Sequence, residues 1–358
     1  MDQRRILVIN PGSTSTKIAV FAETEELFSI DLVHSQQELD SCASLADQLP
    51  MRKEAILKTL TEKGFAMSDF AAIACRGGTF GKADGGAYLV DEALLEACRH
   101  PRTNHPSNLA AIIGYELGNP LEIPAFIYDA VCTDEVWPLA RRSGLKGMDR
   151  KPNSHVLNTR AVCRQYAEAQ GKRYEDMSFV CAHIGGGISL NLHQGGRIVD
   201  VLSDDEGPMS PERAGRLNAM KLVKLCFSGK YTEAQVSRML KGDGGLRSHL
   251  GTSDVREAER MVQEGNAEAE IVLQTMAYQI AKGIGELAAA ASGKVDSILL
   301  TGGAARSKYL TDQIRDRVSF IAPVQVVPGA MEMEALDKGI LRVLSGEETA
   351  KYYQGRKK

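Results

Sequence analysis

The sequence predicts an α/β protein made of two domains of the same design. Residues 5–9 form a continuous apolar strand, small polar residues turn the chain, and residues 17–21 form a second strand. The same order of strand, small-residue turn and strand returns about 175 residues later, in residues 178–182 and 188–192. Segments with helical spacing lie between such strands, which is typical of α/β layers. The repetition favours a duplicated fold with one hairpin opening each half.

The other elements follow from their own patterns. A third strand at residues 297–301 ends in Gly302-Gly303 and leads into a helix at 307–318. Paired glycines at such a turn let the backbone approach a ligand closely. Apolar residues three to four positions apart predict further helices at 91–99, 108–117, 267–291 and 332–344.

The length of the chain, 358 residues, fits two domains better than a single core. A stretch rich in glycine and charge at residues 144–150 marks the predicted boundary. We therefore expect a first domain at 1–147, completed by the C-terminal helix 335–358. The second domain would span residues 148–334.

The composition excludes several classes of protein. The net charge is −3 and Lys and Arg are scattered, so no basic face for nucleic acid or anionic membrane is predicted. No apolar run approaches the roughly 20 residues of a membrane span. The start of the chain runs directly into the first strand and leaves no room for a signal peptide. The 7 cysteines form no CxxC pair, so we expect reduced core thiols and a cytoplasmic protein.

The turn from Asn10 to Lys17 suits an anion. Glycine allows a tight turn with inward N–H groups, and Ser, Thr and Lys side chains add donors. An ordinary polar hairpin turn is the alternative interpretation from the residues alone. Residues 77–83 have the wrong spacing for a P-loop, and no G-x-G-x-x-G follows a strand. Neither a P-loop nor a Rossmann site is therefore predicted.

A series of motifs along nearly the whole chain resembles the family of acetate and butyrate kinases. The first, V-I-N-P-G-S-T-S-T-K at residues 8–17, has the form of the butyrate kinase branch. The resemblance implies two actin-like (ribonuclease H-like) domains with an ATP cleft between them, as in actin, sugar kinases and heat-shock ATPases. The other motifs are Arg76-Gly77-Gly78, His105-Pro106-Ser107-Asn108-Leu109, Tyr128-Asp129, residues 150–162 with His155 and Asn158, and residues 182–189, 207–215, 251–256, 301–303 and 332–336.

The resemblance also implies which residues bind ATP. Two glycine-rich turns, one in each domain, would hold the phosphates, and two later segments would line the adenosine pocket. For His183 the alternative is a histidine that caps a turn at the end of a strand. The phosphate residues are Asn10, Gly12, Ser13, Ser15 and Lys17, with His183, Gly185, Gly186 and Gly187, and the adenosine residues are Ser253, Asp254, Val255, Arg256, Gly302 and Gly303.

A carboxylate substrate decides what the catalytic residues must do. Its pKa is about 4.3, so it is already ionised at neutral pH and needs no general base. It needs its charge neutralised as it approaches the γ-phosphate, together with in-line positioning and stabilisation of the transferring phosphoryl group. Arginines, histidines and a metal ion are therefore expected, and no aspartate is expected to act as a base.

By resemblance, Arg76 and Arg213 would bind the substrate carboxylate and the transferring phosphoryl group. His105 and His155 would contact the equatorial oxygens. A hydrated Mg²⁺ ion, which keeps few protein carboxylates, would be the cofactor. The metal-site residues would be Asn10, Asp129 and Glu332, with Glu334 as the alternative acid, although Glu332 could equally be an ordinary first-turn acid.

Two positions depart from the family pattern. An aromatic residue normally precedes the active-site histidine at the position of His155, and here Ser154 stands there. Since that residue would border the acyl tail, the smaller Ser154 either lets the pocket admit a longer or branched acid or leaves space that a neighbouring side chain refills. Residues 216–218 also differ from the small residues and proline that are usual near Arg213.

The predicted function is reversible, direct in-line transfer of phosphate from ATP to a short-chain carboxylate such as butyrate or a branched acid. An acetate or propionate kinase is the enzymatic alternative. An actin-like ATPase that works through assembly or a partner is the alternative of another class. A nucleotide-binding protein without activity would be expected to lack Arg76 or His155, and both are present. A homo-oligomer is expected from the family, with helix 267–291 as a candidate interface.

Overall fold

The computed structural model describes residues 4–101 and 103–355 and divides into two compact units. Unit 1 comprises Met1–Asp134 and Met331–Lys358, and unit 2 comprises Glu135–Ala330. Residues 135–147, which we expected in the first domain, pack with unit 2 by this division. The Trp137 amide, for example, donates to the Val199 carbonyl at 2.8 Å. Residues 331–334 pack with unit 1.

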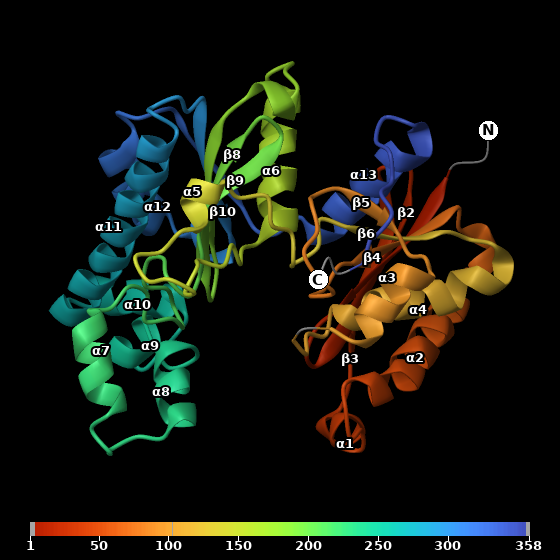
Figure 1. The fold of residues 1–358 in the computed structure, drawn as a ribbon, viewed down its shortest axis with the longest axis horizontal. Coiled ribbons are helices and arrows are strands. Elements are labelled where there is room, and N and C mark those ends of the chain that lie inside the picture. The colour runs from red at the N-terminus through yellow and green to blue at the C-terminus, as the bar shows by residue number, and fades with distance from the viewer. Residues whose placement is uncertain (1–3, 102, 356–358) are drawn as a thin grey trace. The chain divides into compact units, whose positions relative to one another are not determined.

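Unit 1 is built on a six-stranded sheet with the order β3-β2-β1-β4-β6-β5 (Figure 1). The first three strands form an antiparallel meander, and β4 and β6 continue the sheet parallel to β1. The short β5 is antiparallel to β6. The strands are β1 Arg5–Pro11, β2 Ser15–Ala22, β3 Glu25–Val33, β4 Ala72–Arg76, β5 Ala87–Leu89 and β6 Ala125–Tyr128.

Helices cover both faces of this sheet. Ile73 and Ile127 belong to the core cluster that contains residues of α2, α3 and α4. Tyr128 points to the other face, because side chains alternate along a strand, and it lies directly against Gly339 of α13. The helices are α1 Gln36–Asp40, α2 Leu49–Glu62, α3 Glu92–Arg99, α4 Asn108–Gly118 and α13 Glu332–Ser345, with short 3-10 turns at Ala46–Gln48, Met67–Asp69 and Asn119–Leu121.

Unit 2 repeats the plan on a five-stranded sheet with the order β11-β10-β7-β8-β9. Strands β7, β8 and β9 form the antiparallel meander, and β10 and β11 continue it parallel to β7. The hairpins β1–β2 and β7–β8 thus occupy the same place in the two sheets, which confirms the predicted duplication. The strands are β7 Phe179–Ile184, β8 Ile188–Gln194, β9 Arg197–Leu202, β10 Ser297–Gly302 and β11 Val324–Pro328.

The long helix α11 and helix α12 cover one face of the second sheet, and α6 covers the other (Figure 1). The core of unit 2 joins Ile280 and Ile284 of α11 and Ile314 of α12 to buried residues of β7, β8 and β10. The helices are α5 Pro138–Arg141, α6 Val156–Ala169, α7 Ala219–Cys226, α8 Glu233–Leu240, α9 Leu246–Leu250, α10 Val255–Gln263, α11 Ala267–Ala290 and α12 Lys308–Val318, with 3-10 turns at Tyr174–Asp176 and Gly303–Arg306.

The prediction of core thiols holds for four of the seven cysteines, all of which are free. Cys75, Cys98, Cys163 and Cys181 are buried, whereas Cys42 and Cys132 are partly buried and Cys226 is exposed. Burial raises the pKa of Cys98 to about 12, so this thiol stays protonated and unreactive. In the part of the chain that the structure describes, no helix combines the length and apolarity of a membrane span.

Candidate active site

Three candidate residues of unit 1 lie where neighbouring parallel strands end. In the register of β1 and β4 the last pair is Ile9 with Cys75, the residues directly before Asn10 and Arg76, and Arg76 pairs in turn with Tyr128 of β6. Asp129 follows β6 directly. Since side chains alternate across a strand, Arg76 projects to the same face as Tyr128, the face that α13 covers. The topology therefore gathers these side chains at one edge of the sheet.

Glu332, the first residue of α13, links two of them. Its Oε2 accepts a hydrogen bond from Asn10 Nδ2 at 2.9 Å, and its Oε1 lies 2.7 Å from Arg76 Nη1. The Arg76 and Glu332 side chains are 12% and 29% exposed, so this ion pair is largely shielded from water. Glu334 is exposed, and Glu332 is the acid that joins this cluster.

His105 and Asp129 are held by hydrogen bonds from backbone amides. Burial, followed by the charge of Arg76, lowers the pKa of His105, so its imidazole is neutral at pH 7. Its Nδ1 accepts from the Ser107 amide at 3.2 Å, which leaves the proton on Nε2. Asp129 is 2% exposed, and its Oδ1 accepts from the Gly86 amide at 2.8 Å. Its φ of 42° is uncommon for a residue with a side chain and marks a strained position at the strand end.

The glycines after Arg76 are required by close packing. A Cβ on Gly78 would lie 1.9 Å from Oδ1 of Asn108, the first residue of α4. The same Asn108 oxygen accepts from the Thr79 amide at 2.6 Å. This close approach ties the strand that carries Arg76 to the helix start that follows His105.

The turn after β1, where the sequence predicts a phosphate site, is a tight hairpin turn. The Gly12 amide donates to the Ser15 carbonyl at 2.8 Å, while Gly12 and Ser13 themselves are exposed. Lys17 is exposed and lies opposite Asn10 in the β1–β2 register, so the two side chains share a face. Sequence reasoning missed the buried Arg52 behind this turn, because an arginine within a helix usually lies on the surface.

Unit 2 brings its own set of candidates together at the ends of β7 and β10. The two strands are parallel, and His183 pairs with Thr301. The turn 185–187 and the pair Gly302-Gly303 are therefore neighbours. Gly302 has a φ of 93°, and a Cβ there would lie 2.4 Å from the Ile184 carbonyl. Only glycine fits this close approach.

Two histidines of unit 2 stack face to face. The rings of His155 and His183 are 3.8 Å apart and 7° from parallel. His155 precedes α6, and its Nδ1 lies 2.8 Å from Ser189 Oγ. Asn158, three residues on, places its Nδ2 2.9 Å from His183 Nδ1 and 3.2 Å from Thr301 Oγ1.

This network assigns a donor to the turn. With the Asn158 amide donating to Nδ1, neutral His183 carries its proton on Nε2. Nε2 is also the atom that a Cβ on Gly185 would meet, at 3.2 Å, so this donor faces the glycine turn. Asn158 belongs to the motif at residues 150–162, and the motif alone does not indicate this role. Asn158 lies three residues, about one helical turn, after His155, and this spacing in the sequence predicts that the two side chains lie on the same side of the helix.

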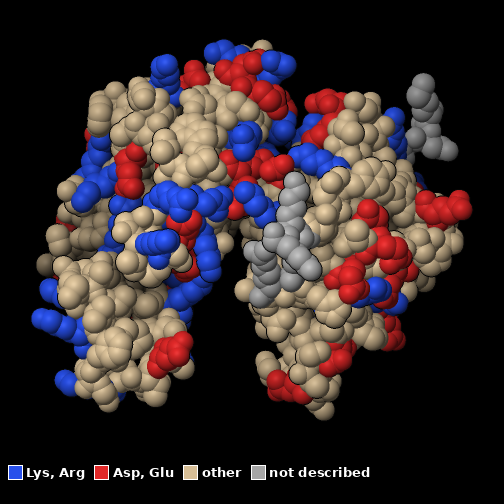
Figure 2. All heavy atoms as spheres, in the orientation of Figure 1, with Lys and Arg blue, Asp and Glu red and all other residues tan. Residues whose placement is uncertain are grey.

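Arg213 lies in a cluster of charges that surrounds the same turn. Its Nε is 3.5 Å from Asp204 Oδ2, and a Cβ on Gly187 would lie 3.1 Å from that carboxylate. Ser210 Oγ donates to the Gly186 carbonyl at 2.7 Å, which fastens the segment before Arg213 to the turn. Figure 2 shows Lys and Arg side chains of unit 2 interspersed with Asp and Glu.

The predicted adenosine segment leads into α10. Ser253 Oγ accepts from Arg247 Nη2 at 2.9 Å. Asp254 caps α10 by accepting from the Arg256 amide at 2.9 Å, and it also pairs with the Arg256 guanidinium at 2.6 Å. That pairing lowers the pKa of Asp254 to about 2. Val255 is buried as the first residue of the helix, so all four residues have structural contacts of their own.

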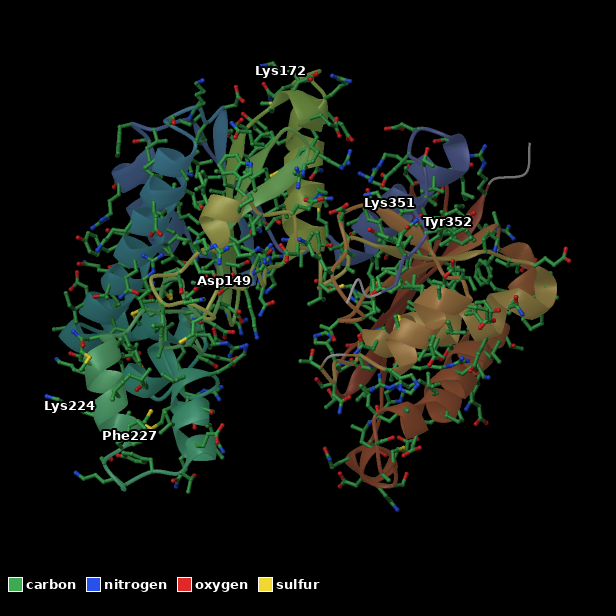
Figure 3. The ribbon with its side chains drawn as sticks, in the orientation of Figure 1. Asp149, Lys172, Lys224, Phe227, Lys351 and Tyr352 are labelled. Carbon is green, nitrogen blue, oxygen red and sulfur yellow. The ribbon has the colours of Figure 1, made fainter. Side chains whose placement is uncertain are left out.

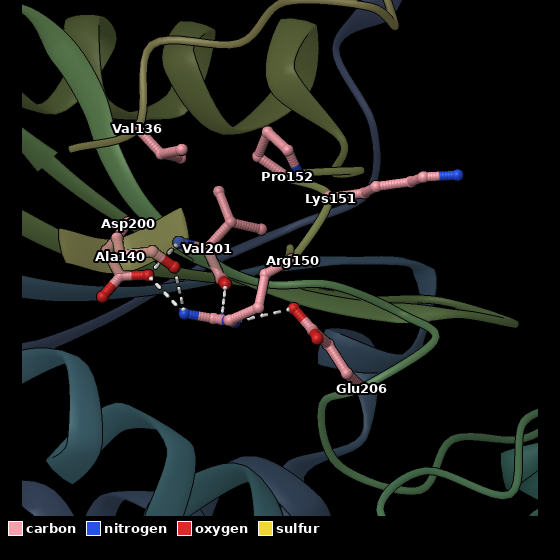
Figure 4. A pocket seen from close by; sticks show the side chains of 8 residues that line it. All are labelled: Val136, Ala140, Arg150, Lys151, Pro152, Asp200, Val201 and Glu206. Atoms are coloured by element: carbon pink, nitrogen blue, oxygen red, sulfur yellow. Dashed lines mark hydrogen bonds and ion pairs between the residues drawn. The ribbon is translucent and has the colours of Figure 1, made fainter. Parts of the chain in front are cut away.

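Arg150 anchors the segment that carries Ser154. Its guanidinium binds Asp200 at 3.3 Å and Glu206 at 3.0 Å, beside a shallow hollow (Figure 4). Ser154 is half-buried, and its Oγ is buried without a hydrogen-bond partner. A buried hydroxyl without a partner is uncommon, and here no polar atom of the protein lies within hydrogen-bond distance of it.

The donor sets differ in the metal they suit. Asn10, Asp129 and Glu332 in unit 1 offer oxygen atoms, which fit Mg²⁺. Among the described residues, the only group of three His, Cys, Asp or Glu side chains with ligand atoms within 4.8 Å of one another is Cys163, Cys181 and His193. It is fully buried and has soft sulfur donors, so it does not suit Mg²⁺.

Comparison with known proteins shows the family. The sequence profile of the acetokinase family matches residues 139–320. Probable butyrate kinase 2 of Caldanaerobacter subterraneus subsp. tengcongensis is 46% identical over 351 residues, which are 98% of this chain and 99% of that protein. The chain belongs to the acetokinase family. The resemblance drawn from the motifs is thereby confirmed, and so is the class of enzyme, a kinase with a carboxyl group as acceptor.

Solved structures agree on the fold of this acetokinase. Acetate kinase of Porphyromonas gingivalis has a TM-score of 0.77 at 20% identity, covering 95% of this chain and 100% of that one. A propionate kinase of Francisella tularensis subsp. tularensis SCHU S4 has a TM-score of 0.74 at 16% identity, covering 94% and 98%. Since the sequence identities are 20% or less, these structures are evidence for the fold alone. They confirm the predicted actin-like α/β class.

Proposed function

We propose that this acetokinase transfers the γ-phosphoryl group of ATP to a short-chain carboxylate, butyrate or a branched relative, and that the reaction is reversible. The observation that supports it best is the cluster of Asn10, Arg76 and Glu332 at the carboxyl edge of parallel strands. It combines a fixed guanidinium with oxygen donors and a neutral histidine, His105, nearby. This is the set that an already ionised nucleophile requires.

In this proposal Arg76 and Arg213 bind and neutralise oxygens of the acid and of the transferring group, because the guanidinium fork matches planar oxygen pairs. His105 and His155 donate to equatorial oxygens, and the neutral state of His105 suits a donor that need not release its proton. No residue has to remove a proton. The Gly86 amide donates to Asp129 Oδ1, and in this proposal Asp129 contributes to the metal site rather than acting as a base.

Phosphate binding would fall to two turns, residues 12–17 in unit 1 and residues 183–187 in unit 2. The Nε2 proton of His183 would donate to a phosphate oxygen. Ser253, Gly302 and Gly303 would border the adenosine, whereas Asp254 and Arg256 would act through the capped start of α10. Mg²⁺ at Asn10, Asp129 and Glu332 would neutralise charge on the phosphates when bound.

We further propose that the protein forms a homo-oligomer. Helix α11, the predicted interface, lies largely in the core of unit 2, although Ile271 and Tyr278 are exposed. Helix α7 presents more apolar surface: none of its residues is buried, and Phe227, which follows it, is 87% exposed (Figure 3). A second copy of the chain would cover this surface.

The decisive experiment is a direct assay of acyl phosphate. ATP, Mg²⁺ and acids from acetate to valerate are incubated with the protein, and the product is trapped with hydroxylamine. The proposal expects ADP and acyl phosphate in equal amounts, with butyrate or isobutyrate preferred. An optimum at acetate or propionate would favour the shorter-chain alternative. ATP hydrolysis without trapped product would contradict carboxylate transfer.

A further inference from the structure

A buried arginine lies directly behind the turn that follows β1. Arg52 of α2 is 0% exposed. Its Nη1 donates to the Ser15 carbonyl at 2.7 Å and to Thr16 Oγ1 at 2.8 Å, and its Nη2 donates to the Ser13 carbonyl at 3.2 Å. Nε and Nη2 also reach the side-chain oxygen of Gln48 at 3.1 and 2.9 Å. One guanidinium therefore fixes three of the four residues from 13 to 16.

The acceptors around Arg52 are all neutral. They are two carbonyls, one hydroxyl and one amide oxygen, and among the described residues no carboxylate forms an ion pair with Arg52. Burial lowers the pKa of the guanidinium, as expected for a charge held away from water. An unpaired buried charge is costly, so neutral donors would serve better if hydrogen bonding to the turn were the whole purpose. The retained charge points to an anion that the turn receives.

A second hydrogen bond orients the Thr16 hydroxyl to which Arg52 donates. Thr16 Oγ1 lies 2.9 Å from His34 Nε2, and both residues are buried. Arg52 donates to Thr16 Oγ1, and the threonine can in turn donate its own proton to a neutral His34 Nε2. Burial, and then the charge of Arg52, lower the pKa of His34, so its imidazole is neutral and can accept a hydrogen bond from Thr16. The His34 amide also donates to the Thr14 carbonyl at 2.9 Å.

We propose that Arg52 is a positioning residue for the nucleotide. It holds residues 13–16 in the conformation that binds phosphate, and its unpaired charge increases the attraction of the turn for a polyanion. Arg52 does not touch the ligand itself, because it binds the carbonyls on the inner side of the turn while Gly12 and Ser13 are exposed. This inference rests on the proposed use of the turn for ATP phosphates.

The test compares nucleotides that differ in phosphate number. Affinities of the full-length protein for adenosine, ADP and ATP are measured by calorimetry for the wild type, Arg52→Met and Arg52→Lys. We expect Arg52→Met to weaken ATP binding on the order of 10-fold, ADP binding less, and adenosine binding within about twofold. Lys53→Met, which removes the same charge from a surface ion pair with Glu116, is the matched control and should bind all three normally.

Hydrogen exchange supplies a readout that needs no ligand. Amides of residues 12–17 should exchange faster in Arg52→Met and Arg52→Lys than in the wild type, and at the wild-type rate in Lys53→Met. If Arg52→Met does not fold, Arg52→Lys carries the test, since one ammonium cannot hold both the Ser13 and Ser15 carbonyls. It should then raise the KM for ATP several-fold and leave the KM for the acid unchanged.

The outcomes separate this inference from the proposed function. Wild-type exchange in the turn, or an equal loss of affinity for adenosine and ATP, would overturn the role of Arg52 and leave carboxylate phosphorylation standing. A wild-type protein that binds ATP tightly and forms no acyl phosphate would overturn the function and leave Arg52 as a positioning residue. Failure of the wild type to bind ATP would overturn both.

Discussion

The guanidinium of Arg76 and the carboxylate of Glu332 form an ion pair in which Nη1 lies 2.7 Å from Oε1. Arg76 ends a buried strand and Glu332 starts a helix more than 250 residues later, so the fold and not the sequence brings them together. The pair holds the guanidinium in place before any ligand binds. A preorganised charge costs little reorganisation free energy when the transition state forms. This is the basis of the first prediction.

Arg76→Ala should lower kcat by roughly 10²- to 10³-fold, the effect of removing one donor to developing charge. Arg76→Lys should restore activity only in part, because an ammonium cannot replace the planar fork. The measurement is acyl phosphate formation at saturating ATP and acid. Arg99→Ala, at an exposed position at the end of α3, is the control and should keep full activity. Activity of Arg76→Ala within about threefold of wild type would remove Arg76 from the site.

The second prediction concerns the missing base. Because the nucleophile is already ionised and the pKa of His105 is lowered, kcat should stay flat from about pH 6.5 to 8.5 apart from titration of the nucleotide and its metal. Asp129→Asn should act mainly by raising the Mg²⁺ concentration needed for half-maximal activity. A variant that regained activity at high pH with an unchanged Mg²⁺ requirement would instead identify Asp129 as a base.

The sequence predicted the parts of this structure that depend on local patterns. The hairpins that open each half, the long helix α11 and the glycine pair after β10 follow from apolar runs and turn residues. Candidate residues at strand ends, such as Arg76 and Asp129, also follow, because parallel strands end at one edge of a sheet.

Other features depend on tertiary contacts that no local pattern reports. Arg52 lies in a helix whose sequence suggests a surface position, and only the turn packed against it shows why it is buried. The choice of Glu332 over Glu334 depends on which side of α13 faces β4. The charge cluster around Arg213 required the fold of residues 204–247 to be known.

The third prediction concerns Asp337, a buried carboxylate of α13. It is 1% exposed, and neither of its oxygens has a hydrogen-bond partner. Burial, followed by the charge of Glu23 and that of Glu334 and opposed by Lys338, raises the pKa of Asp337 to about 8. Between the unfolded pKa of about 4 and this value, the folded state binds one more proton than the unfolded state. Stability should therefore fall as pH rises through this window.

Asp337→Asn should remove this pH dependence. At pH 8.5 the variant should be more stable than the wild type, on the order of 2 kcal/mol, because the buried charge is gone. At about pH 4, the low end of this window, where Asp337 is protonated in the fold and partly protonated in the unfolded state as well, the difference should be small. The measurement is the free energy of unfolding of both proteins at the two pH values, with the exposed Asp31→Asn as control. Parallel pH profiles for wild type and Asp337→Asn would show that Asp337 is ionised in the fold.

The fourth prediction tests the proposed oligomer. Phe227→Glu places a charge on the apolar surface of α7, and the mass measured by light scattering should fall toward that of one chain, 38.8 kDa. Phe320→Glu is the matched control, because Phe320 is 85% exposed but lies after α12. Equal masses for wild type and Phe227→Glu would exclude this surface as the interface.

The last prediction concerns Ser154 and the acyl pocket. Each buried CH₂ contributes about 0.8 kcal/mol, close to a fourfold gain in kcat/KM, so two extra methylenes from acetate to butyrate allow roughly a 15-fold preference. Ser154→Phe should reduce activity on butyrate and isobutyrate and spare acetate, because the added ring fills space beside His155 and leaves the arginines untouched. The measurement is kcat/KM for acids from acetate to valerate.

A change at Asn153, which is exposed next to Ser154, is the control for disturbance of the segment. Asn153→Phe adds the same ring, and since it points to solvent it should leave the acid profile unchanged. If Ser154→Phe and the wild type share one profile, Ser154 does not border the acyl tail. If both phenylalanine variants lose activity on every acid alike, the ring disturbs the anchor that Arg150 forms with Glu206 rather than the pocket. Only a loss confined to Ser154→Phe and to the longer acids supports the proposed pocket, because steric exclusion of the tail depends on both position and chain length.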